Sequence, residues 1–69
     1  MNIADLKDLH YKGSEAELDD AVEAFCEQYA SYDEFYEANY KEIPSLRHGY
    51  MRILELIIIL MYDKESIKN

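Results

Sequence analysis

The chain has 69 residues, and 15 Asp and Glu against seven Lys and Arg give it a formal net charge of −8 at pH 7. This length allows one small domain, which we expect to be helical, over residues 1–69, and the charge argues against direct binding of nucleic acid or of an anionic membrane. One cysteine excludes an internal disulfide, and one Cys with two His falls short of the usual four zinc ligands, so self-association is the stabilising device we expect.

Neither an export signal nor a membrane span is visible in the sequence. Residues 1–6 include Asp5 where a secretory signal needs a basic region and an apolar run. The longest apolar run, residues 56–61, has six residues, whereas a helix needs about 20 to cross a bilayer. We therefore expect a cytoplasmic protein that has no membrane partner.

A short helix is predicted close to the N-terminus. Asn2 can cap its start, and Gly13 supplies the left-handed residue that ends it. The apolar face of this helix holds Ile3, Leu6 and His10, which the helical repeat places on one side.

A second helix is predicted to begin at Ser14, because Ser14 and Glu17 have the spacing of a capping box. Seven apolar or aromatic residues follow at steps of three and four and form one stripe: Leu18, Val22, Phe25, Tyr29, Tyr32, Tyr36 and Tyr40. Ser31 and Glu34 form a second capping-box pattern that could begin a new helix. Since the stripe keeps its phase there, we favour one continuous helix over residues 14–42.

Pro44 ends this second helix, because proline disfavours helical geometry in the residue before it, and Ser45 can cap a last helix over about residues 46–63. One side of the last helix carries polar residues: His48, Arg52, Glu55 and Asp63. The other side carries mainly apolar residues: Tyr50, Ile53, Leu54, Ile57, Ile58 and Met61. Ile59 falls in the polar sector, so the C-terminal half of this helix is apolar nearly all round.

This surplus of apolar surface predicts association of two chains. The three consecutive Ile residues would also suit a buried strand, but the sequence offers no second strand-like run to pair with it. We therefore expect an all-α fold, a helical hairpin with a short helix before it, that forms a homodimer of the four-helix-bundle type. The residues expected in the core or the dimer interface are Tyr50, Ile53, Leu54, Ile57, Ile58, Ile59 and Met61.

The most informative feature is the one-sided charge of residues 14–40. This stretch has no Lys or Arg and contains nine acids: Glu15, Glu17, Asp19, Asp20, Glu23, Glu27, Asp33, Glu34 and Glu37. Four of them lie four residues apart and form a row on successive turns: Glu15, Asp19, Glu23 and Glu27. Glu34 and Glu37 continue the same side of the predicted helix. Like charges at this spacing cost stability, so the row favours a basic partner surface.

Two other interpretations of these acids stay open. Acidic residues also keep a small protein soluble, and the helix dipole favours Glu15 and Glu17 in the first turn of any helix. Imitation of a DNA duplex would need one charge per about 1.7 Å, whereas nine acids on about 40 Å of helix give one per about 4.5 Å. We therefore expect partial mimicry that covers one basic groove of a protein.

Aromatic side chains alternate with these acids in residues 32–40. Tyrosine suits an interface because it buries a large ring and keeps a hydroxyl for hydrogen bonds, although Tyr29, Tyr32 and Tyr36 could also form a semi-polar edge of the core. Phe35 stands about 100° off the stripe, so it either packs on a second surface or is exposed. The predicted partner-binding residues are Glu15, Asp19, Glu23, Glu27, Tyr32, Glu34, Phe35, Glu37 and Tyr40.

The sequence shows no pattern for catalysis, metal ligation or cofactor binding. HExxH and CxxC are absent, and nearby carboxylates make Cys26 a poor nucleophile. His48, Arg52 and Glu55 share one side of the last helix and are expected to form a structural polar cluster. We therefore expect no catalytic residue, no metal and no cofactor, and we expect that the protein is not an enzyme.

In size and charge the chain resembles small acidic inhibitors: phage anti-defence proteins, anti-CRISPR proteins among them, anti-activators, antitoxins and immunity proteins. The predicted function is a protein-binding module that inhibits a target protein by occupying a basic surface, such as a nucleic-acid-binding one. The alternative is a structural subunit that docks into a larger assembly through Ile58, Ile59 and Leu60. A third, less favoured hypothesis is an enzyme that pairs His48 with Glu55 across a dimer axis.

Overall fold

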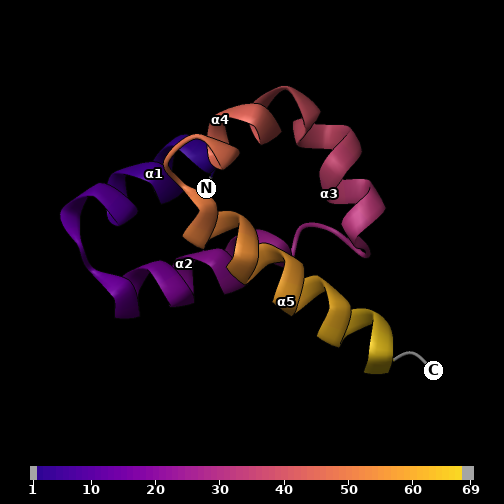
Figure 1. Ribbon diagram of the computed structural model, residues 1–69. Helices are drawn as coiled ribbons and strands as arrows, with labels where there is room; N and C mark the ends of the chain where they lie inside the picture. Colours follow the sequence, from indigo (N-terminus) through magenta and orange to yellow (C-terminus); the bar gives the residue numbers. More distant parts are fainter. Residues whose placement is uncertain (1, 68–69) are drawn as a thin grey trace.

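Helices account for 83% of residues 2–67, the part of the chain that the computed structural model describes, and that part contains no strand. The elements in chain order are α1 (Ile3–Lys12), α2 (Glu15–Cys26), α3 (Tyr32–Asn39), the 3-10 turn η1 (Tyr40–Glu42), α4 (Ile43–Arg47) and α5 (Met51–Ile67). In Figure 1, α1 and α2 form an antiparallel pair, α5 crosses α2, and the segment from α3 to α4 arches back toward α1. The predicted all-α fold is confirmed.

Helix α1 has the boundaries that its sequence predicts. The side chain of Asn2 accepts a hydrogen bond from the Asp5 N–H at 3.1 Å, and the Asp5 carboxylate accepts one from the Asn2 N–H at 3.0 Å. These two bonds satisfy backbone donors that a helix start leaves free. Gly13 ends the helix with a φ of 76°, and Ile3 and Leu6 turn into the core.

The continuous helix predicted for residues 14–42 is wrong, because the chain breaks after α2. Helix α2 begins after Ser14 as expected, although the Ser14 side chain makes no capping hydrogen bond. It ends at Cys26, and Ser31 then caps α3 by accepting a hydrogen bond from the Glu34 N–H at 3.4 Å. The Glu34 carboxylate accepts a second bond from the Ala30 N–H at 2.8 Å. The capping pattern of Ser31 and Glu34 therefore marks a real helix start, which the regular spacing of the stripe did not predict.

The predicted last helix is also divided, and Pro44 begins a helix rather than ending one. Pro44 lies in the first turn of α4, where its missing N–H removes no helical hydrogen bond and its fixed φ suits the helix. Ser45 is therefore inside α4 and is not a cap. His48 ends α4, and Gly49, with a φ of 116°, leads to the start of α5.

All five α-helices contribute to one core, in which α2 and α5 form the most extensive contact. The buried side chains are Ile3, Leu6, Leu18, Ala21, Val22, Phe25, Cys26, Phe35, Ile43, Leu46, Ile53, Leu54, Ile57 and Met61. Helices α1, α3 and α4 thus cover apolar surface of α5 that a two-helix hairpin would leave in water. This cover is the physical reason why one chain can bury most of the surface that suggested a dimer.

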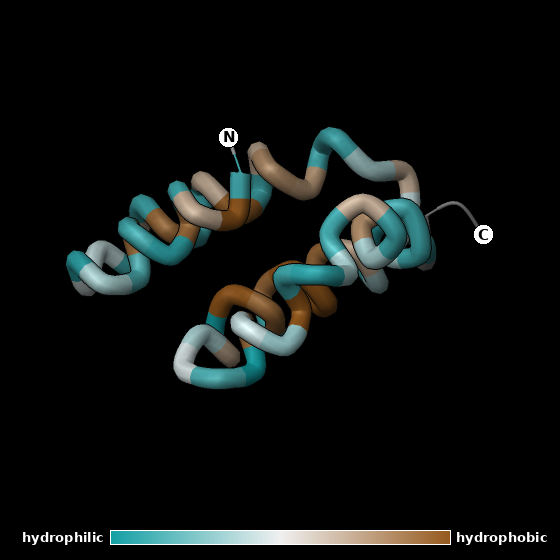
Figure 2. Tube along the Cα trace, turned by 90° about the horizontal axis from the view of Figure 1, so that it is seen from above, coloured by the Kyte–Doolittle hydropathy of each residue, from teal (hydrophilic) through white to brown (hydrophobic). Residues whose placement is uncertain are grey.

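The residues expected in the core or the dimer interface divide into three groups. Ile53, Leu54, Ile57 and Met61 are buried within one chain, and Tyr50 and Ile58 are partly buried. Ile59 is 55% exposed, so it does not belong to the core of one chain, and its place in a dimer interface stays a prediction; it lies on the polar side of α5, where the helical repeat puts it. Figure 2 shows that hydrophobic residues concentrate in α5, whereas α1 and α2 mix both kinds.

Candidate functional site

The outer side of α2 carries the densest charge that the structure describes. Six acids, which we call the acidic face, are all exposed: Glu15, Glu17, Asp19, Asp20, Glu23 and Glu27. The opposite side of α2 is apolar and buried, with Leu18, Val22 and Phe25 in the core. Because burial of one side fixes the rotation of the helix, the six carboxylates are held toward solvent.

Within residues 2–67 none of these carboxylates forms an ion pair, although Arg52 lines a depression with Glu15 and Lys64 lines another with Glu23 and Glu27. Across residues 2–67 the structure shows one ion pair, between Lys7 Nζ and Glu42 Oε2 at 3.8 Å, and it lies outside the acidic face. Lys41, Arg47 and Arg52 make no ion pair in this part of the chain. The row at Glu15, Asp19, Glu23 and Glu27 therefore keeps the mutual repulsion that its spacing implies.

The acidic face carries more charge per length of helix axis than residues 14–40 do as a whole. From position 15 to position 27 the helix advances about 18 Å, so six acids give one charge per about 3 Å of axis. One strand of B-DNA has a phosphate every 3.4 Å or so, that is about the same spacing. Over the length of α2 the six acids therefore match one nucleic-acid strand in charge per length of axis, while at 100° per residue they spread over about 200° around the helix.

Lys64 supplies the cation at the C-terminal end of α2. Its Nζ donates hydrogen bonds to the carbonyl oxygens of Tyr29 at 2.8 Å and Cys26 at 3.5 Å. The Cys26 carbonyl belongs to the last residue of α2, where the end of a helix carries partial negative charge, and it also accepts a hydrogen bond from the Tyr29 N–H at 3.1 Å. Lys64, Leu60 and Glu27 also line a shallow depression of about 140 Å³ beside the acidic face.

Cys26 lies below this depression and is buried. Burial raises the pKa of its thiol to about 11, and the nearby Lys64 partly offsets that effect. The thiol is therefore protonated at neutral pH, which makes it a weak nucleophile.

Glu34 and Glu37 do not continue the acidic face, so that part of the prediction is wrong. They lie on α3, which Figure 1 shows turning away from the end of α2. Both are exposed, and together with Gln28, Tyr29 and Ala38 they line an open depression of about 450 Å³. Glu34 also caps the start of α3 through its bond to Ala30. The acids thus form two surfaces that meet near the joint at residues 27–31.

The aromatic residues near this joint form a cluster that holds α3 against α2. Phe35 is completely buried, and its ring centroid lies 6.1 Å from Phe25, 5.9 Å from Tyr29 and 5.5 Å from Tyr32. The prediction that Phe35 contacts a partner is therefore wrong, because the restarted helix turns it inward. Tyr29 and Tyr32 are partly buried against it, which matches the core-edge interpretation.

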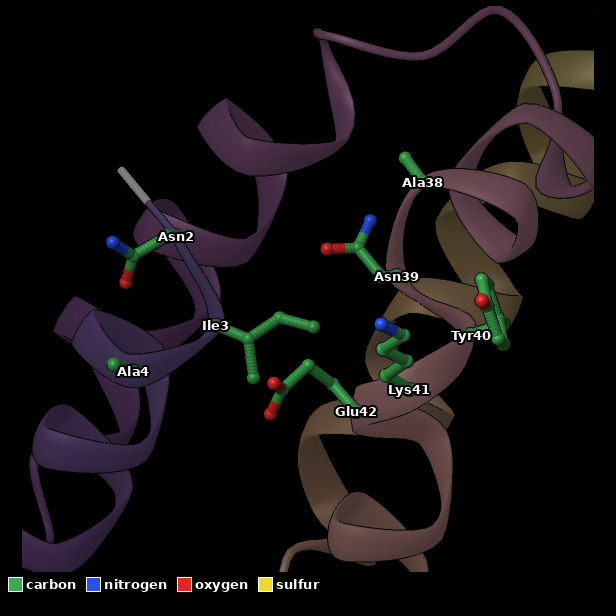
Figure 3. A pocket seen from close by; sticks show the side chains of 8 residues that line it. All are labelled: Asn2, Ile3, Ala4, Ala38, Asn39, Tyr40, Lys41 and Glu42. Carbon is green, nitrogen blue, oxygen red and sulfur yellow. The ribbon is translucent and has the colours of Figure 1, made fainter.

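Tyr40 is the aromatic residue of the predicted set that remains open to solvent, at 55% exposure. It lines a cleft of about 610 Å³ between the start of α1 and η1, which Figure 3 shows from close by. Asn2, Ile3 and Ala4 form one wall of this cleft, and the labelled residues from Ala38 to Glu42 form the other.

The sequence did not predict the role of Lys7. Lys7 Nζ donates a hydrogen bond to the Ser45 hydroxyl and lies 5.1 Å from the centroid of the Tyr50 ring, a cation–π contact. His10 packs edge-on against the same ring at 5.4 Å. These contacts join α1 to the segment before α5. No local pattern could reveal them, because the partners lie about 40 positions apart in the chain.

Among the described residues no group of three or more His, Cys, Asp or Glu is placed to hold a metal ion. In the same residues no helix is long and apolar enough to span a bilayer. Comparisons of the chain with known protein families, curated proteins and solved structures found no match. The functional conclusion therefore depends on the geometry and charge of the chain itself.

Proposed function

We propose that the chain is a small protein-binding module that inhibits a target protein by placing the acidic face of α2 on a basic surface of that target. The observation that supports this proposal is the acidic face itself, six exposed carboxylates without an ion pair anywhere in residues 2–67. A surface of one sign speeds association with an oppositely charged partner and disfavours partners of like charge.

The spacing of the carboxylates favours a target whose basic surface otherwise binds nucleic acid. One charge per about 3 Å of axis over about 18 Å of helix is comparable with about five phosphates of one strand. A groove that receives a short stretch of one strand could accept α2 in its place. The apolar side of α2 is occupied by the core, so the contact would be predominantly electrostatic and sensitive to salt.

Charge reversal at the acidic face tests this proposal. We expect Glu23→Lys combined with Glu27→Lys to weaken target binding about tenfold or more, which corresponds to about 1.4 kcal/mol of binding free energy. Helicity should stay the same, because both side chains are exposed. The measurement is affinity capture from the source cell with each immobilised variant, followed by elution with salt and identification of the eluted proteins.

A matched control is Asp8→Lys combined with Glu55→Lys, which changes the net charge equally on exposed positions of α1 and α5. The wild-type chain and this control should retain the same basic protein, and the Glu23 and Glu27 variant should lose it. Equal capture by all three chains would contradict the proposal.

We also propose that two copies of the chain associate, as the short length and the apolar last helix suggest. Helix α5 leaves large hydrophobic side chains in contact with solvent, with Met51 exposed by 46%, Ile59 by 55% and Tyr62 by 66%. A second copy would cover such surface and would present two acidic faces to a target.

A further inference from the structure

Four residues form a line along the solvent-facing side of α5, which we call the α5 stripe: Arg52, Leu56, Ile59 and Asp63. Their steps along the helix are four, three and four, so they project within about 60° of one another at 100° per residue. Arg52, Ile59 and Asp63 are exposed, and Leu56 is partly exposed. The stripe thus has a cation at one end, an anion at the other and two aliphatic residues between them.

The order of these residues is self-complementary. The step pattern is the same from either end, so two antiparallel copies of α5 can align the four positions one to one. Arg52 then faces Asp63 of the second copy at both ends, and Leu56 faces Ile59 of the second copy on both sides of the dyad. A parallel arrangement would instead oppose Arg52 with Arg52 and Asp63 with Asp63, which repel.

We infer that the α5 stripe is the surface through which two copies of this chain associate, antiparallel and related by a two-fold axis near residues 57 and 58. Neither charged residue of the stripe makes an ion pair within the described part of its own chain, so both are available to a partner. The acidic face cannot serve this purpose, because it would oppose carboxylates with carboxylates.

The stripe is short, which defines the kind of dimer to expect. Eleven residue steps cover about 16.5 Å of helix. A standard stable interface buries about 800 Å² on each partner, or about one sixth of the 4732 Å² surface of this chain. A single helix pair buries less than that. The dimer should therefore depend on concentration, with the apolar centre supplying affinity and the two ion pairs setting direction and register.

This inference makes the homodimer part of the proposed function specific, and it is independent of target binding by the acidic face. Its test is sedimentation equilibrium of the full chain from micromolar to millimolar concentration. The wild-type chain should dimerise as the concentration rises. Ile59→Ser should abolish the dimer while the circular dichroism spectrum stays unchanged, because Ile59 is 55% exposed.

The charged ends allow a sharper test. Arg52→Glu alone and Asp63→Lys alone should each weaken the dimer about tenfold or more, because each opposes like charges at both ends. An equimolar mixture of the two variants should dimerise about as strongly as the wild type, since each pairing then opposes a cation with an anion. Asp63→Lys also separates the effect of the α5 stripe from repulsion between the net charges of the two chains. It changes the net charge of each chain from −8 to −6, and this change by itself would strengthen association.

Lys12→Glu and Asp8→Lys are matched controls, because they make the same charge changes at exposed positions of α1. Neither control, nor their mixture, should reproduce the loss and the rescue.

A wild-type chain that stays monomeric at millimolar concentration overturns the inference and the homodimer proposal together. A dimer that Ile59→Ser, Arg52→Glu and Asp63→Lys leave intact overturns the inference alone. Loss of target binding on Glu23 and Glu27 reversal, with the dimer unchanged, would leave both proposals standing.

Discussion

At the scale of single residues, the neighbours Phe35 and Tyr36 have opposite roles. Phe35 is completely buried, and its ring centroid lies within 6.1 Å of three other aromatic ring centroids, two in edge-on and one in a tilted orientation, which the ring quadrupoles favour. Tyr36 is 45% exposed and touches the cluster through a tilted contact with Tyr32. One residue therefore stabilises the joint between α2 and α3, and the next remains open to solvent.

We expect Phe35→Ala to lower the free energy of unfolding by about 3 to 5 kcal/mol, because it removes a completely buried ring and leaves a cavity. Tyr36→Ala, the matched control one position along α3, should cost less than about 1 kcal/mol, because much of its ring is already in water. Urea denaturation followed by circular dichroism measures both values. Equal losses for the two variants would mean that the aromatic cluster does not hold α3 in place.

At the scale of elements, two short interruptions decide how the helices pack. Residues 27–31 turn α3 away from the axis of α2, and residues 48–50 separate α4 from α5. Gly49 has a φ of 116° in the second interruption, a backbone conformation that L side chains rarely adopt. A continuous helix at either place would carry α3 or α4 away from the core that they cover.

Gly49→Ala should destabilise the fold by about 1 to 2 kcal/mol. A Cβ at this position would meet no atom within 4 Å, so the cost arises from the backbone conformation and not from a clash. His48→Ala, at the adjacent position with a φ of −103°, should change stability by less than about 0.5 kcal/mol. Thermal unfolding of the two variants measures the difference, and a Gly49→Ala chain as stable as wild type would refute it.

At the scale of the whole molecule, charge opposes folding. The net charge is −8, and the ion pair that the structure shows in residues 2–67 joins side chains that are 22% and 51% exposed, so its contribution is small. The acidic face adds local repulsion on one helix. The apolar core must therefore stabilise the fold against its own electrostatics.

Added sodium chloride should consequently stabilise the monomer. Shortening the Debye length from about 30 Å at 0.01 M to about 8 Å at 0.15 M screens the repulsion. We expect the melting temperature of a dilute sample to rise by about 4 °C or more, which corresponds to about 1 kcal/mol in a domain of this size. The Glu23→Lys and Glu27→Lys variant, with a net charge of −8 + 4 = −4, should respond less. A melting temperature that falls with salt would contradict this prediction.

Part of the site followed directly from the sequence. The unpaired run of acids and the start of α2 at Ser14 are local patterns, and so is the position of Ile59 in the polar sector of the last helix. Glu34 and Phe35 were misplaced because both were assigned on a helix that continued past Ser31. The capping pattern of Ser31 and Glu34 competed with one stripe, and only the packing of Phe35 into the core decides between them.

The amino-acid sequence alone determined that the chain is helical, that α1 lies between Asn2 and Gly13, and that residues 14–40 carry acids without cations. These properties depend on neighbours three or four positions apart, which the local chain contains. Only the tertiary structure decided where the long helices break, which side chains cover α5, and that six acids lie exposed along α2 and its C-cap while Glu34 and Glu37 lie on a separate helix. Those outcomes depend on burial between segments about 30 or 40 positions apart, and burial is a property of the folded chain.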